Sequence, residues 1–191
     1  MKKTIIYSAL LLGYSLLTSA YDLPKGWFKA GSAPDKYEMG IDRGKGRNGG
    51  SCATIKSGKN KISGFGTLMQ TSLPDKYLGK RVRMTGYMKS EDVNKWAGFW
   101  LRVDQAGSSR SIAFDNMSER PVKGTTDWKK YEIVLDVSIK ASNIAFGALI
   151  GGTGQIWFDE MEFEIVDQSV PVTGTGVIHS TEKPSNLNFE E

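Results

Sequence analysis

The chain has 191 residues, a formal net charge of +4 at pH 7, 39% hydrophobic residues and a single cysteine. This length fits one domain of ordinary size with a substantial core, and it argues against a second full domain. One cysteine excludes an intramolecular disulfide, so stability has to come from packing or from a bound metal.

Residues 1–20 predict a secretory signal peptide. Lys2 and Lys3 precede an apolar segment, and the small residues Thr18–Ala20 follow it, as suits signal-peptide cleavage. The apolar segment is shorter than the roughly 20 residues that span a bilayer, and no later segment is apolar enough to do so. We therefore expect a secreted or periplasmic protein without a membrane span. Without Lys2 and Lys3, 23 of the 25 Lys and Arg remain against 21 Asp and Glu, and this near balance argues against nucleic-acid binding.

Residues 21–167 predict an all-β domain. Apolar and polar residues alternate with period two, Gly, Pro, Asn and Asp separate the runs, and no segment shows a sustained helical repeat. Without helices to cover a parallel sheet, this pattern indicates an antiparallel β-sandwich, such as a jelly roll. We expect strands at residues 37–43, 50–56, 64–72, 80–90, 96–105, 110–116, 128–137, 143–150 and 155–166. One face of the last strand is expected to line the core: Trp157, Met161, Phe163 and Ile165.

The stretch from Trp96 to Asp104 has two chemically different faces at strand period. One face is apolar and can seal a sheet against a core, whereas the other places two indole rings beside a guanidinium and a carboxylate. The apolar face would hold Ala97, Phe99, Leu101 and Val103, and the opposite face would hold Trp96, Trp100, Arg102 and Asp104.

The preceding strand, residues 80–90, has the same two-faced pattern. A hairpin through residues 91–95 would pair the two strands directly, and their polar sides would form one patch. Such a patch suits a sugar, which presents C–H groups on one face and hydroxyls around its rim. The alternative is that the indoles stack on arginines and only stabilise the sheet. The predicted ligand-binding residues are Arg83, Thr85, Tyr87, Trp96, Trp100, Arg102 and Asp104.

The sequence offers little for catalysis. The only histidine, His179, follows the predicted domain, so a Ser-His-Asp or Cys-His arrangement cannot form within it. We expect no enzyme activity, and an esterase or glycosidase that uses carboxylates alone stays as a minor alternative. The sequence also predicts a site for a hard cation, because Asp42, the glycine-rich residues 44–50 and Asp159 offer oxygen ligands suited to calcium.

Five short motifs stand near the ends of the expected strands: Leu23–Trp27, Gly49–Ser51, Gly79–Arg83, Asp127–Trp128 and Trp157–Glu160. Together they resemble CenC-type carbohydrate-binding modules, a group of galactose-binding-like jelly rolls, over residues 23–166. The resemblance implies a noncatalytic module of a secreted protein. It also implies a structural calcium, with Asp159 as a ligand. Modules of this type also occur appended to bacterial regulators and peptidases, where no sugar ligand is established.

One departure from that family concerns the first strand. Such modules usually begin with an Asn-x-x-Phe-Glu strand, which is missing ahead of Leu23, whereas Asn186–Glu190 at the C-terminus resembles it. Residues 168–191 are otherwise rich in Thr, Ser, Gly and Pro and predict a flexible tail or linker. We expect residues 186–190 to dock onto the sheet of a monomer, to swap into a second copy to give a dimer, or to begin the next unit of a tandem array.

The function predicted from these features is binding of a glycan, or of another polyhydroxylated ligand, on an aromatic and arginine-bearing sheet face. The alternative is a structural or protein-interaction β-sandwich domain of the cell envelope that binds no sugar. An aromatic and arginine patch suits a protein interface as well, so composition does not separate the two. The fold by itself does not settle the function either.

Overall fold

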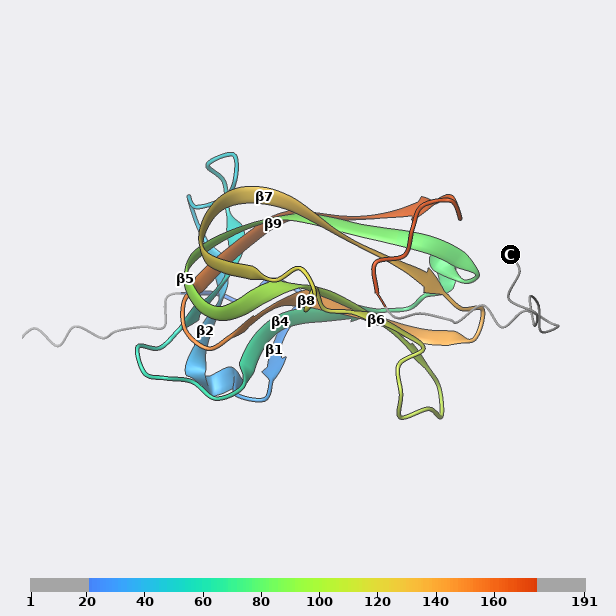
Figure 1. The fold of residues 1–191 in the computed structure, drawn as a ribbon, viewed down its shortest axis with the longest axis horizontal. Helices are drawn as coiled ribbons and strands as arrows, with labels where there is room; N and C mark the ends of the chain where they lie inside the picture. The colour runs from blue at the N-terminus through green and yellow to red at the C-terminus, as the bar shows by residue number, and fades with distance from the viewer. Residues whose placement is uncertain (1–20, 175–191) are drawn as a thin grey trace, which may run out of the picture.

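The computed structural model describes residues 21–174, and these residues form a two-layer antiparallel β-sandwich (Figure 1). The predicted fold class is therefore confirmed. Helical segments in this range are limited to two 3₁₀ turns, η1 (Pro34–Lys36) and η2 (Asp75–Tyr77). Across the same residues, no helix is both long and apolar enough to cross a membrane.

Strand pairing divides the sandwich into two layers. The strands are β1 (Phe28–Gly31), β2 (Tyr37–Asp42), β3 (Cys52–Ser57), β4 (Phe65–Ser72), β5 (Lys80–Gln105), β6 (Ala113–Asp115), β7 (Val122–Val137), β8 (Ala141–Gly151) and β9 (Gln155–Val166). One layer, the β9 layer, has the order β2-β3-β9-β5-β7, and the other, the β8 layer, has the order β1-β4-β8-β5-β6. Figure 1 shows β7 and β9 above β8, β4 and β1.

Strand β5 belongs to both layers. Residues 81–91 pair with β9, residues 96–105 pair with β8, and the strand bends between them, where Asp92 has a φ of 51°. Figure 1 shows this strand curving around one end of the sandwich. The predicted hairpin through residues 91–95 is therefore wrong, because the chain continues from one layer into the other instead of turning back on itself.

The hydrophobic core lies between the two layers, and both halves of β5 contribute to it. Val82, Met84 and Met88 come from the first half, and the predicted apolar face of the second half joins the same cluster. Phe99 makes an edge contact with Phe158 of β9, with 6.1 Å between ring centroids, which joins the layers. Each fully buried side chain of this size stabilises the fold by about 1.5–3 kcal/mol.

Beyond β9, residues 167–174 return across the sandwich. Arg81 of β5 donates hydrogen bonds from Nη1 to the carbonyls of Gln168 and Val170, and the Thr173 amide donates to the Val134 carbonyl at 2.9 Å. The sequence assigned residues 168–174 to a flexible tail, whereas here they contact β5, β6 and β7. The predicted docking strand at residues 186–190 lies outside the described residues.

Candidate ligand-binding groove

A groove of about 330 Å³ lies on the outer face of the β8 layer. Its lining is mostly apolar and comes from β1, β4, β8, the second half of β5, and β6. Three of the predicted ligand-binding residues line it, namely Trp96, Trp100 and Arg102. The alternation along β5 therefore places its tryptophans on the side opposite the core, as predicted.

Two glycines of β8 stand opposite the two indoles of β5. Gly147 pairs with Trp100 and Gly151 pairs with Trp96, so β8 carries no side chain at the positions directly beside these rings. A Cβ atom added at Gly151 would lie 3.3 Å from Nε1 of Trp96. At Gly147 an added Cβ atom would instead collide with the Leu68 carbonyl oxygen of β4, so this glycine allows the β4 backbone to approach β8 closely.

Trp100 forms the floor of the groove. Its Nε1 donates a 2.8 Å hydrogen bond to Oγ1 of Thr67 on β4, so the indole reaches across β8 from one neighbour to the other. Thr67 in turn donates to the Ala148 carbonyl at 2.7 Å. Trp100 is only 6% exposed, which differs from the open stacking platform that the sequence suggested. Its role is to fix the shape of the groove.

Other aromatic side chains offer the exposed surface. Trp96 and Phe114 are half-buried, and Phe65 is 37% exposed, and all three line the groove. Sequence reasoning missed Phe65 and Phe114. The alternation of β4 could have indicated Phe65, because Phe65, Thr67 and Met69 share one face of the strand at period two.

The polar end of the groove is built around Arg102. Its Nε lies 3.0 Å from Oδ1 of Asp104 and 3.2 Å from Oδ2. Asn143 on β8 donates to the same carboxylate at 3.0 Å. Asp104, also predicted as a site residue, therefore lies next to the groove and holds Arg102 in place.

The other three predicted site residues lie on the β9 layer and not in the groove. Arg83 bonds Glu164 at 2.6 Å and lowers the pKa of that carboxyl, while Thr85 is buried. The ring of Tyr87 lies 3.8 Å beneath the guanidinium of Arg47. The prediction of one combined patch is wrong, because the bend in β5 sends the two halves of the strand into different layers.

The carboxylates predicted to bind calcium accept hydrogen bonds from the protein. Asp42 accepts from Nε1 of Trp157 at 2.8 Å, and Asp159 accepts from the amides of Arg47 and Glu160. Among residues 21–174, no three His, Cys, Asp or Glu side chains gather in a way that suits a metal. These contacts lend no support to calcium at this position, and a calcium site stays a prediction from the resemblance.

Cys52 lies near these carboxylates and is buried. Burial, together with the negative charges of Asp159 and Asp42, raises the pKa of the Cys52 thiol to about 12. The side chain is therefore a protonated, unreactive thiol at neutral pH.

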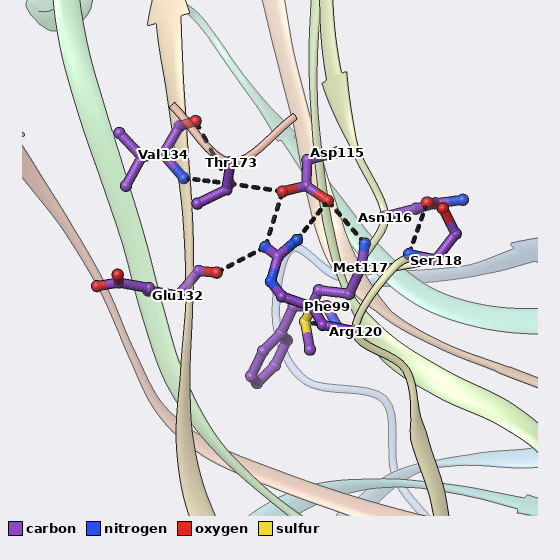
Figure 2. Close-up of polar contacts among 9 residues, drawn as sticks. All are labelled: Phe99, Asp115, Asn116, Met117, Ser118, Arg120, Glu132, Val134 and Thr173. Atoms are coloured by element: carbon purple, nitrogen blue, oxygen red, sulfur yellow. Dashed lines mark hydrogen bonds and ion pairs between the residues drawn. The ribbon is translucent and has the colours of Figure 1, made fainter. Parts of the chain in front are cut away.

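Asp115 anchors the β6 edge of the groove (Figure 2). Its carboxylate is 5% exposed and accepts hydrogen bonds from the Met117 amide at 2.7 Å, from Nη2 of Arg120 at 2.7 Å and from Oγ1 of Thr173 at 2.6 Å. Arg120 also donates to the Glu132 carbonyl on β7. One buried charge thus ties β6, β7 and the segment 167–174 together.

This anchor acts directly beside the groove. Phe114 and Asn116, the neighbours of Asp115, both line the groove, and all three residues line an adjoining hollow with Arg120 and Thr173. Met117 follows with a φ of 60°, and its sulfur accepts the Phe99 amide at 3.3 Å. The backbone that carries Phe114 and Asn116 is therefore held from both ends.

No family model matches the chain. A curated relative, the uncharacterised HTH-type transcriptional regulator YbfP of Bacillus subtilis (strain 168), is 44% identical over 169 residues. The alignment covers 87% of this chain and 57% of YbfP, so the chain spans little more than half of that relative's length. Residues 21–174 contain no α-helix, and therefore no helix-turn-helix.

Solved structures with the same fold include carbohydrate-binding modules. The xylan-binding domain of Paenibacillus barcinonensis Xyn10C superposes with a TM-score of 0.55 at 12% identity, covering 78% of this chain and 90% of that domain. The C-terminal family 22 carbohydrate-binding module of Clostridium thermocellum Xyn10B superposes with a TM-score of 0.51 at 13% identity, covering 74% of this chain and 86% of that module. The enzymatically active domain of bacteriophage CBA120 tailspike protein 4 superposes with a TM-score of 0.57 at 11% identity, covering 74% of this chain and 20% of that chain. At these identities the likeness establishes the fold alone, a jelly roll of the carbohydrate-binding-module type.

Proposed function

We propose that the chain is a noncatalytic carbohydrate-binding module, of the CenC type that its sequence motifs resemble, and that it binds an oligosaccharide in the groove of the β8 layer. The observation that carries this proposal is a groove with half-exposed aromatic side chains beside a polar end. Trp96, Phe65 and Phe114 would pack against the C–H faces of sugar rings, and Arg102 and Asn116 would bind hydroxyls. The fold shared with carbohydrate-binding modules supports it.

The predicted signal peptide, residues 1–20, supports a location outside the cytoplasm, where a protein can reach polysaccharides. The name of the relative YbfP favours a second role, as the sugar-sensing part of a transcriptional regulator. The two roles use the same groove and differ in compartment. Cell fractionation with an antibody against the native protein separates them, because a sensor that controls DNA binding stays in the cytoplasm.

Binding to a glycan array, followed by calorimetry with the best ligand, tests the proposal. Replacing Trp96 or Phe114 with alanine should cost about 1–2 kcal/mol of binding free energy, roughly a 5-fold to 30-fold loss of affinity. Trp128→Ala is the matched control, because this half-buried indole on β7 does not line the groove. Melting temperatures of the variants show whether each one is folded.

Unchanged glycan affinity in both groove variants would show that the groove is not the glycan-binding site. An array without any bound glycan, together with a stable protein complex that Trp96→Ala disrupts, would favour the protein-interaction alternative.

A further inference from the structure

We propose that the groove is selective for acidic oligosaccharides, and that Arg102 binds the carboxylate of a uronic acid unit. This inference rests on the proposed function and adds the chemical class of the ligand. It follows from the charges that line the groove, from the hydrogen bonds of Arg102, and from the position of Arg102 between two hollows.

The lining of the groove holds one charged side chain, and it is a cation. Arg102 is the only charged residue in its lining, which is otherwise apolar apart from small polar side chains such as Thr67 and Asn116. The carboxylate of Asp104 forms an ion pair with Arg102 and also accepts a hydrogen bond from the amide of Asn143. An anionic ligand would therefore meet no uncompensated negative charge at this end of the groove.

Arg102 uses its guanidinium differently from most other paired arginines of residues 21–174. Arg43, Arg47, Arg81 and Arg120 each donate a hydrogen bond from a terminal nitrogen to a carboxylate. Arg83 donates to Glu164 through Nε, as Arg102 does to Asp104, but its Nη1 also lies 3.7 Å from Oε2 of Glu132. Arg102 contacts Asp104 through Nε alone, and within residues 21–174 its two Nη atoms make no hydrogen bond. The outer edge of the guanidinium, with two parallel N–H groups, is left available to solvent, and its side chain is 44% exposed.

That free edge matches a carboxylate better than a hydroxyl. Two parallel N–H groups bind both oxygens of a carboxylate at once, which adds charge and geometry to the interaction. Asp104 and Asn143 orient the guanidinium before any ligand arrives, so little side-chain freedom is lost on binding. Vicinal hydroxyls of a neutral sugar can accept from both N–H groups as well, but they bring no negative charge to the interaction.

The position of Arg102 favours a chain over a single sugar. Arg102 lines both the aromatic groove and an adjoining hollow formed with Asp104 and residues 108–111. A second cation, Arg110, lies in that hollow. A carboxylate held at Arg102 would thus belong to an internal unit, with neighbouring units on the aromatic side chains and beside residues 108–111.

Calorimetry with matched neutral and acidic oligosaccharides tests the inference. The probes are xylohexaose, the same backbone carrying a glucuronic acid branch, hexagalacturonate, its methyl ester, and a sulfated galactan oligomer. The variants are Arg102→Gln and Arg102→Lys, with Arg83→Gln as control, because Arg83 lies on the β9 layer. We expect an acidic probe to bind more tightly than its neutral counterpart. Arg102→Gln should weaken that binding by about 10-fold to 100-fold, while Arg83→Gln should leave it unchanged.

The outcomes separate the inference from the proposed function. Neutral probes that bind as tightly as acidic ones, with no effect of Arg102→Gln, would overturn the acidic preference and leave a carbohydrate-binding groove. Preference for the sulfated probe would overturn the assignment to a carboxylate. Equal losses in Arg83→Gln and Arg102→Gln would indicate nonspecific attraction to positive charge and would also overturn the inference. Binding of no saccharide at all, neutral or acidic, would overturn the proposed function itself.

Discussion

Replacing Thr173 with valine should destabilise the whole sandwich, although this residue follows the last strand. Oγ1 of Thr173 donates to the buried Asp115 carboxylate at 2.6 Å and accepts the Val134 amide at 2.9 Å. Valine has nearly the same shape, so the substitution removes both hydrogen bonds while keeping the packing. The other donors to Asp115 stay in place, so the buried charge keeps its ion pair with Arg120.

The magnitude follows from these two bonds. A hydrogen bond to a charged group contributes about 1.5–3 kcal/mol, and a bond between neutral groups about 0.5–1.5 kcal/mol. Thr173→Val should therefore lower the free energy of unfolding by about 2–4 kcal/mol. For a chain of this size, such a loss corresponds to a fall in melting temperature of roughly 5–15 °C.

Urea unfolding followed by circular dichroism measures this loss. Thr173→Ser keeps the oxygen and should fall within about 1 kcal/mol of the native protein, and Thr71→Val replaces an exposed threonine of β4 whose hydroxyl makes no hydrogen bond within residues 21–174. Hydrogen exchange at the Val134 amide gives a second readout, since this group loses its acceptor. Equal urea midpoints for Thr173→Val and Thr173→Ser would refute the view that residues 167–174 are part of the fold.

Three further predictions concern other parts of the sandwich. Thr67→Val leaves the buried N–H of Trp100 without its acceptor and should cost about 1–3 kcal/mol in urea unfolding, against little change for Thr71→Val. Cys52, with its raised pKa, should resist a thiol reagent at pH 8 until denaturant is added, and rapid labelling of the native protein would contradict its burial. Arg83 lowers the folded-state pKa of Glu164 below the unfolded value of 4.5, so the pair stabilises the fold above that pH and this contribution is lost as the pH falls below it. Glu164→Gln should therefore show a smaller fall in melting temperature on acidification, and an identical fall would argue against the pair.

Period-two alternation predicted the orientation of side chains well where a strand is regular. Between Trp96 and Asp104 it separated the core face from the groove face correctly, because each side of a sheet receives every second residue. It also identified Arg102, the charged residue of the groove. Alternation says which residues share a side, however, and not which strands pair. For that reason the strand that crosses between layers was mistaken for a hairpin.

A β-bulge explains a second failure, in β9. Asp159 pairs with Tyr87 and Glu162 with Thr85, so β9 carries one extra residue there, and Glu160 has a φ of 51°. The extra residue reverses the alternation. Ile156 and Phe158 point into the core before the bulge, and Met161 and Phe163 do so after it, whereas Trp157 lies outside, beneath Lys89. No glycine marks the bulge, so the sequence carried no signal of it.

The groove could be predicted only in part, because its walls come from distant segments. Phe65 and Phe114 approach Trp96 through the pairing of β4 with β8 and of β6 with β5. Gly151 of β8, which leaves space beside Trp96, is meaningful only once its partner on β5 is known. Such information lies in the strand order and not in any single motif.

A strand shared by both layers has a consequence for how the domain folds. Neither half of the sandwich can be completed while β5 is unplaced, so a partly folded species with one intact layer would expose the apolar side of the other. We expect cooperative unfolding in one transition. Since β5 pairs with β8 and β9 over long separations in the chain, folding should also be slow compared with that of helical domains of similar length.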